Sequence, residues 1–401
     1  MKKMILLLVS VVVLLSPLVP SYAETMSVQR IHGGTRYETA VEISKQSFSA
    51  SPYALIASGE NFPDALGGGP LAIQLQAPIL LVGKNSVPAV VTAELERLGV
   101  TTIYLAGGES VISAEVETSL KSLAKVERIS GMNRYETNLA FLPMIRSLNN
   151  APLAAKTVHW HVNGTNFPDA LAAAPFVAQM NAKRTSDVGA HFLTLQRPGL
   201  AVNPDSYAIG GPSVVAGEPL KRIHGATRYE TAVKIAQEYP KSLGKSIDTI
   251  YLSNGENFPD ALAASPLISK ENAALLLTTS KTLSPETKDY LITHNIKKVV
   301  ILGGFGAVSQ AVQDELESLY KETPAPEPDD SYKGLGLDYP YVDEAGNGLI
   351  KGNISAKNEK IYHVPGMRDY NRTQISTAKG ERWFKTEREA REAGWRMPLN
   401  H

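Results

Sequence analysis

The chain has 401 residues, and its 40 basic and 40 acidic side chains give a formal net charge of zero at pH 7. This balance gives no global signal for binding nucleic acid or a membrane surface, so any recognition of an anionic ligand must be local. The sequence contains no cysteine, which excludes disulfides and a lipid-anchoring cysteine. Each domain must therefore be held together by its own hydrophobic core.

The N-terminus has the layout of a secretory signal peptide. Lys2 and Lys3 precede an apolar run over residues 4–15, and Ser21-Tyr22-Ala23 offers a small-residue cleavage site. A retained membrane anchor is the weaker interpretation, because the apolar run is short for a bilayer span. We expect a signal peptide over residues 1–23, a secreted extracellular protein, and no membrane span.

Three phrases recur through the rest of the chain. The first is Arg-Ile-x-Gly-x-x-Arg-Tyr-Glu-Thr, which starts at Arg30, Arg128 and Arg222. The second is Asn-Phe-Pro-Asp-Ala-Leu, which starts at Asn61, Asn166 and Asn257. The third is a glycine pair, found at Gly107-Gly108, Gly210-Gly211 and Gly303-Gly304. The spacing exceeds the ~20–50 residues of solenoid repeats, so each copy is expected to be a small domain.

Copy one alternates helices with short apolar strands. Thr35 and Glu38 form a Ser/Thr-x-x-Glu capping box, which predicts that the first phrase ends in a helix N-terminus. The apolar pattern then predicts strands at 54–57, 78–82, 102–106 and 125–129, and helices at 64–76, 88–98 and 113–123. Three consecutive glycines from Gly67 would weaken the helix over 64–76 unless close packing there requires a bare surface.

Copy three follows the same plan, and copy two is eroded. The pattern predicts copy-three strands at 249–252, 274–278 and 298–302, and helices at 260–269, 285–294 and 309–320. In copy two, residues 196–206 lie between predicted strands at 192–195 and 207–209 and contain Pro198, Gly199 and Pro204, so a loop is expected there. The alternation predicts α/β modules with parallel sheets covered on both faces.

The C-terminal part differs in composition from the repeats. It begins with a Pro-rich acidic linker, and residues 331–401 beyond it carry 12 basic against 9 acidic residues, with two of the three tryptophans. The predicted organisation is a signal peptide (1–23), three repeats (24–125, 126–219 and 220–322), a linker (323–331) and a small α+β domain (332–401).

No catalytic signature is present in the sequence. Asp64, Asp169 and Asp260 recur, but each follows a proline and precedes an apolar helical run, so we predict helix-start roles for them. His159 and His161 have no evident third ligand, and no glycine-rich nucleotide motif opens a helix. Triplication favours binding over catalysis, because linked sites gain avidity. We expect a non-enzymatic protein with no catalytic residue, no metal and no cofactor.

The arginines of the first phrase are candidate ligand-binding residues. Arg36, Arg134 and Arg228 could fork onto phosphates or carboxylates of a polymer. Alternatively, these arginines pair with nearby carboxylates such as Glu38 and the repeated aspartate, or hold one copy against the next. The sequence leaves both interpretations open and favours the structural one.

The three phrases, together with Pro78-Ile79-Leu80-Leu81, resemble the cell wall binding repeat type 2 family over about residues 30–320. The resemblance implies three Rossmann-like or flavodoxin-like modules in a pseudo-threefold arrangement, which attach a surface protein to an anionic glycopolymer of a Gram-positive wall. It also implies ligand-binding roles at two strand ends, for Pro78, Ile79, Leu80, Leu81, Leu275, Leu276 and Leu277. Copy two has Phe192-Leu193-Thr194-Leu195 instead, so we expect its site to be the weakest.

The tail resembles a small domain appended to secreted thermonuclease-like proteins, through phrases such as Glu381-Arg-Trp-Phe and Ala393-Gly-Trp-Arg. The nuclease body is missing, so nuclease activity is not implied. The main hypothesis is non-catalytic attachment to an anionic, teichoic-acid-like wall polymer or to peptidoglycan. The alternatives are a peptidoglycan hydrolase (amidase) or a modifier that partners a wall hydrolase, and a surface nucleic-acid-binding protein acting through residues 332–401.

Overall fold

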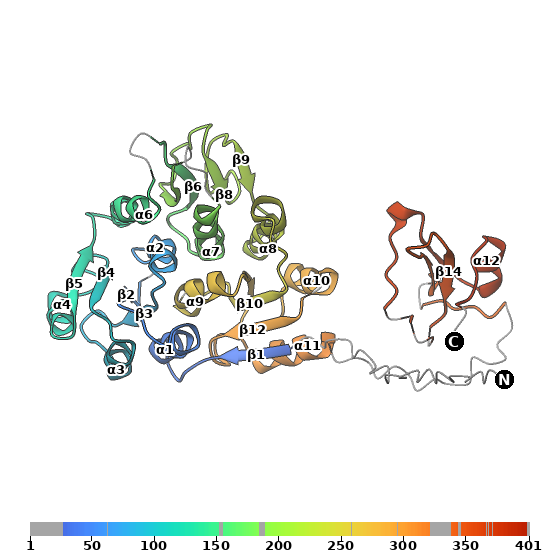
Figure 1. Ribbon diagram of the computed structural model, residues 1–401, viewed down its shortest axis with the longest axis horizontal. Helices are drawn as coiled ribbons and strands as arrows, with labels where there is room; N and C mark the ends of the chain where they lie inside the picture. Colours follow the sequence, from blue (N-terminus) through green and yellow to red (C-terminus); the bar gives the residue numbers. More distant parts are fainter. Residues whose placement is uncertain are drawn as a thin grey trace, which may run out of the picture. The chain divides into compact units, whose positions relative to one another are not determined.

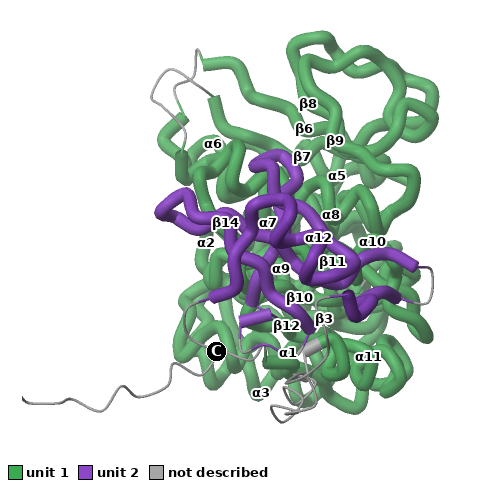
Figure 2. The backbone as a smooth tube through the Cα atoms, turned by 90° about the vertical axis from the view of Figure 1, so that its right-hand side faces the viewer, with its two compact units in different colours: residues 1–320 green, residues 321–401 purple. Residues whose placement is uncertain are grey.

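A computed structural model describes residues 27–320 and 338–398, except residues 62, 152–154, 184–188, 258, 295, 344–345, 366, 368 and 371. The chain divides into two compact units, residues 1–320 and 321–401, coloured separately in Figure 2. The predicted signal peptide and linker lie outside the described residues. No helix in the described ranges is long and apolar enough to cross a membrane.

The first unit contains three parallel sheets of four strands each, which we call the sheets of modules 1, 2 and 3 (Figure 1). Module 1 has the strand order β3-β2-β4-β5. Its strands are β2 (Tyr53–Ser58), β3 (Ile79–Val82), β4 (Thr102–Ala106) and β5 (Lys125–Ile129). Its helices are α1 (Arg36–Ser47), α2 (Gly68–Leu75), α3 (Ala89–Leu98) and α4 (Ala114–Lys121).

Module 2 has the strand order β7-β6-β8-β9, with strands β6 (Val158–Asn163), β7 (His191–Gln196), β8 (Tyr207–Ile209) and β9 (Lys221–Ile223). Its helices are α5 (Arg134–Ala140), α6 (Leu142–Leu148) and α7 (Pro168–Ala182).

Module 3 contains strands β10 (Thr249–Asn254), β11 (Ala274–Thr278) and β12 (Lys298–Leu302). Its helices are α8 (Arg228–Glu238), which continues into the π-helical turn η1 (Tyr239–Leu243), α9 (Pro259–Lys270), α10 (Pro285–Thr293) and α11 (Gln310–Tyr320). The fourth strand of this sheet is β1 (Ser27–Ile31), which comes from the start of the unit and pairs in parallel with β12.

The α/β class and the parallel sheets confirm the sequence-based expectation, and most predicted elements match to within one or two residues at each end. One helix differs: the element predicted at 64–76 begins only at Gly68, because residues 63–67 form turns. The loop predicted over 196–206 is confirmed. A second crossover of module 2, between β8 and β9, is also a loop.

The loss of both helices changes one face of the module 2 sheet. In module 1 this face is apolar, with Ile56 and Leu80 fully buried under α3 and α4. The corresponding register positions in module 2 are His161 and Thr194, which pair with each other across β6 and β7. Thr194 is buried here and its hydroxyl lies 2.8 Å from Nδ1 of His159, so this face of module 2 is held partly by polar contacts.

Each sheet takes its last strand from the segment that begins another repeat in the sequence. β5 completes the sheet of module 1, β9 completes that of module 2, and β1 completes that of module 3. Each first phrase therefore contributes its strand to the preceding sheet and its helix to the following module. The last link joins residues 27–31 to residues 298–302 and closes the three modules into a ring.

The three modules meet at a central contact between helices α2, α7 and α9, which lie in the middle of the unit in Figure 1. A Cβ atom placed on Gly69 would lie 3.2 Å from Cβ of Ala174 and 3.6 Å from Oγ of Ser265. These residues occupy the same position of the second phrase in the three copies. The bare surface expected at the glycines of copy one is confirmed, since helices this close leave no room for a larger side chain.

The second unit is a small α+β domain, as predicted. Its antiparallel sheet has the order β14-β13-β15, with β13 (Ile350–Ile354), β14 (Lys360–His363) and β15 (Arg382–Phe384). A short 3₁₀ turn, η3 (Thr377–Lys379), precedes β15, and α12 (Glu387–Glu392) follows it. One side of the sheet packs on a core that includes Tyr362, Phe384 and Trp395.

The central contact predicts how substitutions at Gly69 will act. Replacing Gly69 with leucine inserts a side chain where an added Cβ atom alone would lie 3.2 Å from Ala174, so we expect the free energy of unfolding to fall by about 1–3 kcal/mol. Urea denaturation of the full chain measures this change.

Ser265→Ala is the matched control at the same contact. The Ser265 hydroxyl is buried and has no hydrogen-bond partner among the described residues, so its removal is expected to leave stability unchanged or raise it by up to about 1 kcal/mol. Equal destabilisation by both variants would contradict the close-packing argument.

Candidate functional site

The first arginine of each repeated phrase fastens the strand end of the preceding sheet. Nη1 of Arg30 donates to the carbonyl oxygens of Gly303, at 2.8 Å, and Val308, at 3.0 Å. Arg128 donates to Gly107 O at 2.7 Å, and Arg222 donates to Gly210 O at 2.8 Å. Each arginine thus holds the glycine pair that ends the neighbouring strand, and this contact is structural.

The next residues of the phrase turn the chain into a helix, as the capping box predicted. The N-cap side chains of Thr35, Asn133 and Thr227 accept hydrogen bonds from the N–H group of the glutamate three residues on. Glycine precedes each cap because the chain passes very close to the helix. A Cβ on Gly33 would lie 2.3 Å from Cβ of Glu38, and Gly131 and Gly225 have equivalent contacts.

The second arginine of the phrase reaches the end of the first strand of its own module. Arg134 donates to Gly164 O at 3.1 Å, Arg228 donates to Gly255 O at 2.6 Å, and Arg36 donates to Gly59 O. Arg36 is exposed, and Arg134 and Arg228 are partly exposed. The hydrogen bonds of these arginines thus go to carbonyl oxygens, and the pairing with the repeated aspartate takes the form of an electrostatic effect, of Arg36 on Asp260 and of Arg228 on Asp169.

The recurring aspartates lie beneath the glycine pairs. A Cβ on Gly107 would lie 3.2 Å from Asp64, one on Gly210 would lie 3.0 Å from Oδ2 of Asp169, and one on Gly303 would overlap Asp260. Burial raises the pKa of Asp169 to about 6, although Arg228 and His224 act in the opposite direction. Burial likewise raises the pKa of Asp260 to about 6 against the effect of Arg36.

These electrostatic pairs connect different modules, because Asp260 belongs to module 3 and Arg36 to module 1. The chain brings one such group together at each meeting of two modules, and we call these groups junctions. They are junction 3–1 (Asp260, Gly303, Gly304, His32, Arg36) and junction 2–3 (Asp169, Gly210, Gly211, His224, Arg228). The residues at the same positions of the repeats define junction 1–2 (Asp64, Gly107, Gly108, Ser130, Arg134), in which Asp64 lies beside Gly107.

Each junction lies where the carboxyl ends of parallel strands meet an incoming helix. In the order β3-β2-β4-β5 the chain first moves outward to β3 and then returns to β4, so the connections diverge between β2 and β4. Open α/β sheets bind ligands at such a switch point. Gly59 and Gly107 follow those two strands, and the other two modules repeat the arrangement.

The aspartates have a further role that the sequence analysis missed. Asp169 and Asp260 stand in the first turn of α7 and α9, as the predicted helix-start role requires. Asp64 lies in a turn four residues before α2. All three also contact the glycine pair of their own module, a contact that the shared spacing of the second and third phrases could have suggested.

The strand-end residues predicted to bind ligand are core residues. The exposed fractions of Ile79, Leu80 and Leu81 are 1%, 0% and 0%, and those of Leu275, Leu276 and Leu277 are 1%, 0% and 1%. Pro78, just before β3, is also buried. A ligand can therefore reach only the loops that follow these strands, and the side chains act by fixing where the strands end.

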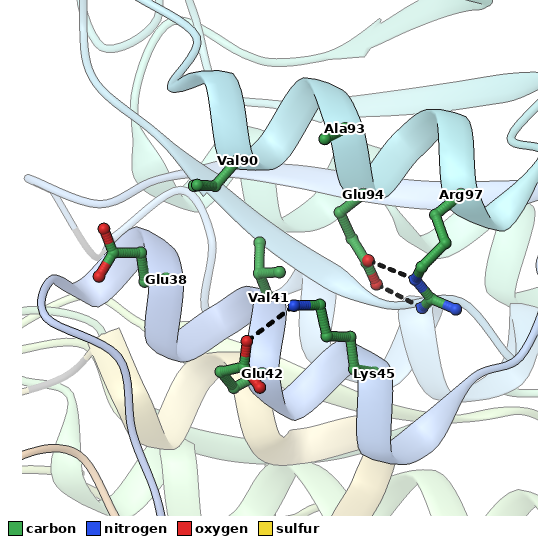
Figure 3. Close-up of a pocket in the computed structure, with 8 residues that line it drawn as sticks. All are labelled: Glu38, Val41, Glu42, Lys45, Val90, Ala93, Glu94 and Arg97. Atoms are coloured by element: carbon green, nitrogen blue, oxygen red, sulfur yellow. Dashed lines mark hydrogen bonds and ion pairs between the residues drawn. The ribbon is translucent and has the colours of Figure 1, made fainter.

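The pocket between α1 and α3, shown in Figure 3, does not have the features of a ligand-binding site. Its volume of about 200 Å³ falls below the ~300–1,000 Å³ of typical ligand sites. Arg97 donates two hydrogen bonds of 2.6 Å to the buried carboxylate of Glu94, and Lys45 donates to Glu42 at 2.8 Å. The charged groups that line the pocket already pair with one another, which indicates a structural role.

The three repeats match one protein family. The match to the family described as Cell wall binding domain 2 covers residues 30–117, 128–218 and 222–313. The chain belongs to this family. Each match begins at the first arginine of a repeated phrase, so every matched repeat starts on a strand of the preceding sheet.

Two proteins of Bacillus subtilis (strain 168) are similar to this chain. An N-acetylmuramoyl-L-alanine amidase, LytC, is 29% identical over 312 residues, covering 75% of this chain and 60% of LytC. A protein described as an amidase enhancer is 27% identical over 299 residues, covering 72% of this chain and 40% of that protein. The chain thus spans about half the length of these relatives.

Solved structures of two Clostridium difficile proteins share the fold. Cwp8 has a TM-score of 0.60 and 26% identity, covering 73% of this chain and 51% of Cwp8. Cwp6 has a TM-score of 0.63 and 24% identity, covering 81% of this chain and 53% of Cwp6. The likeness to Cwp6 concerns the fold alone.

The raised pKa values of Asp169 and Asp260 predict a pH-dependent stability. Between the ordinary pKa of 3.8 and about 6, the native state retains protons that the unfolded state has lost. Stability is therefore expected to fall as the pH rises through this window. Asp169→Asn and Asp260→Asn should match the parent chain at pH 4 and exceed its free energy of unfolding by about 1 kcal/mol each at pH 7, since solvent reaches these carboxylates in part.

Urea denaturation at a series of pH values measures this effect. Asp289→Asn, at an exposed position of α10, is the control and should leave the pH profile unchanged. A parent chain whose stability rises between pH 4 and pH 7, with no difference in either junction variant, would contradict the electrostatic account.

Proposed function

We propose that the chain is a non-catalytic attachment protein of the cell wall, which binds an anionic secondary wall polymer through the three junctions. The observation that carries this proposal is the triplicate junction itself. Each junction places an arginine that is at least partly exposed to solvent beside a glycine-containing turn. This turn lies at the carboxyl edge of a sheet, where backbone groups can approach a ligand closely. Three linked sites of modest affinity gain retention on a repeating polymer through effective concentration.

The electrostatics of a junction suit a phosphate- or carboxylate-bearing sugar chain. Arg36 donates a hydrogen bond to Gly59 O and is exposed to solvent, so its guanidinium can meet an anionic group. At junction 3–1, Phe305 is 51% exposed, and its ring lies 4.4 Å from the Arg30 guanidinium and 6.2 Å from the His32 ring. This ring offers an apolar face for one side of a sugar.

The secreted, wall-associated location belongs to the same proposal. The family match and the likeness to Cwp8 support a surface location, and the N-terminal residues 1–23 have the layout of a signal peptide. Peptidoglycan and the secondary polymer are both candidate partners. The site of copy two, at the strand end Phe192-Leu193-Thr194-Leu195, remains our expectation for the weakest site, because module 2 lacks two covering helices and Met132 replaces the small residue found in the other copies.

A second candidate function is modulation of a wall hydrolase. One relative is an amidase and another is described as an amidase enhancer, and both resemble this chain over most of its length. The described residues contain no group of three histidine, cysteine or acidic side chains that could hold a metal ion. Dye release from walls, with and without an added amidase, separates the alternatives: activity of this chain alone would identify a hydrolase.

The attachment proposal predicts the effect of removing the three junction arginines. The triple variant Arg36→Gln, Arg134→Gln and Arg228→Gln should lose at least about tenfold in retention on purified walls, because each site loses its cation. Sedimentation of the full chain with walls measures retention. Among the single variants, Arg134→Gln is expected to reduce retention least.

The matched control changes charge by the same amount away from the junctions. The control replaces three lysines that each pair with a glutamate three or four residues away in the sequence, namely Lys45, Lys121 and Lys241. Changing all three to glutamine should leave retention unchanged. Retention must also fall when the secondary polymer is extracted from the walls. Equal binding of both triple variants, or full binding to extracted walls, would refute the polymer proposal.

A further inference from the structure

The C-terminal unit has a sheet face that its own core does not use. One face of the sheet carries Tyr362 and Phe384 and packs against the core with Trp395. On the opposite face, Lys351 lies in register with His363 on β14 and with Trp383 on β15. Because residues in register share a face, these three side chains form a row across the sheet.

Lys351 forms no ion pair with a carboxylate among the residues that the structure describes. Its Nζ donates to the carbonyl oxygen of Tyr370 at 3.0 Å and lies 4.4 Å from the ring centre of Tyr370 and 5.6 Å from that of Trp383. Burial lowers the pKa of Lys351. A desolvated ammonium of this kind attracts an anion more strongly than a fully hydrated one does.

Trp383 supplies an open aromatic surface beside this cation. Its side chain is 45% exposed, whereas Trp160 and Trp395 are only 2% and 3% exposed. The described strands leave β15 at the edge of the sheet, and exposed cations surround it in sequence. They are Arg372, Lys379 and Lys385, whereas Arg382 lies on the opposite face, with its guanidinium 4.9 Å from the centre of the Phe384 ring.

The polar groups of this face are mostly engaged with one another. Oδ1 of Asn353 lies 3.1 Å from Nε2 of His363, the carboxylate of Asp369 acts electrostatically on His363, and Glu381 accepts hydrogen bonds from the backbone N–H groups of Ile354 and Ser376. A glycan site needs free amides or carboxylates for its hydroxyl groups. This face instead offers charge and a stacking surface, the combination that binds single-stranded nucleic acid.

We propose that the face formed by Lys351, Tyr370 and Trp383 binds single-stranded nucleic acid, with a base stacked on Trp383 and a phosphate on Lys351. The site is independent of the three junctions, which lie in the first unit. A duplex fits less well, because its bases already stack on each other and cannot reach the indole.

Fluorescence titration of the full chain with a thymidine oligonucleotide at low salt tests this proposal. Because Trp160 and Trp395 are buried, a quenching signal on binding reports on Trp383. Trp383→Ala and Lys351→Met are expected to weaken binding about tenfold or more, as read by anisotropy of a labelled oligonucleotide. Lys351→Met should also reduce the slope of log affinity against log salt by about 0.7.

The conservative variants separate function from folding. Trp383→Phe keeps a stacking ring and should retain most of the affinity while losing the quenching signal. Lys357→Met, at an exposed position in the turn between β13 and β14, removes the same charge elsewhere and should bind as the parent does. Unchanged oligonucleotide binding by Trp383→Ala would overturn the proposal. So would reduced retention on walls with unchanged oligonucleotide binding, which would assign the face to a glycan.

Discussion

The close approach of three helices at Gly69, Ala174 and Ser265 is the constraint on which the first unit depends. Three helices can meet at one axis only if each presents a small side chain there, because their backbones would otherwise be held apart. The second phrase supplies this residue in every copy and places its aspartate five residues earlier. The contact therefore sets the angle between neighbouring sheets and brings each aspartate toward the next module.

The first repeated phrase makes a second set of contacts between neighbouring modules, in addition to the contact of the three helices. Its leading arginine holds the glycine pair of one sheet, and its second arginine holds the strand end of the next, so a single stretch of ten residues spans two modules. Helix α1 packs on α9, α6 packs on α2, and α8 packs on α7. Each junction is consequently made of parts from two modules, and no module could form it alone.

Local patterns predicted the local structure well, and they could not predict the connections between copies. The strands at 102–106 and 298–302 are evident from their apolar runs, and the proline and glycine residues of 196–206 correctly predicted a missing helix. Which sheet receives residues 27–31 is a long-range choice, because the hydrogen-bond partners lie about 270 residues further on. The electrostatic effect of Arg36 on Asp260 could not be predicted for the same reason, because the two residues lie far apart in the sequence. The apolar run at Leu80 fits both a core strand and the resemblance-based binding motif, and burial shows the first.

The pairing of β1 with β12 has a consequence for the order in which the chain folds. Residues 27–31 are synthesised long before residues 298–302, so β1 must wait for almost the whole first unit before its partner strand exists. During that time its edge carries unpaired N–H and C=O groups. If the β12 edge of a second molecule reaches it first, the two chains exchange strands, and repeated exchange produces an open chain of molecules instead of a closed ring. Refolding at low protein concentration thus favours the closed ring, because exchange needs two molecules, and high protein concentration favours the linked form.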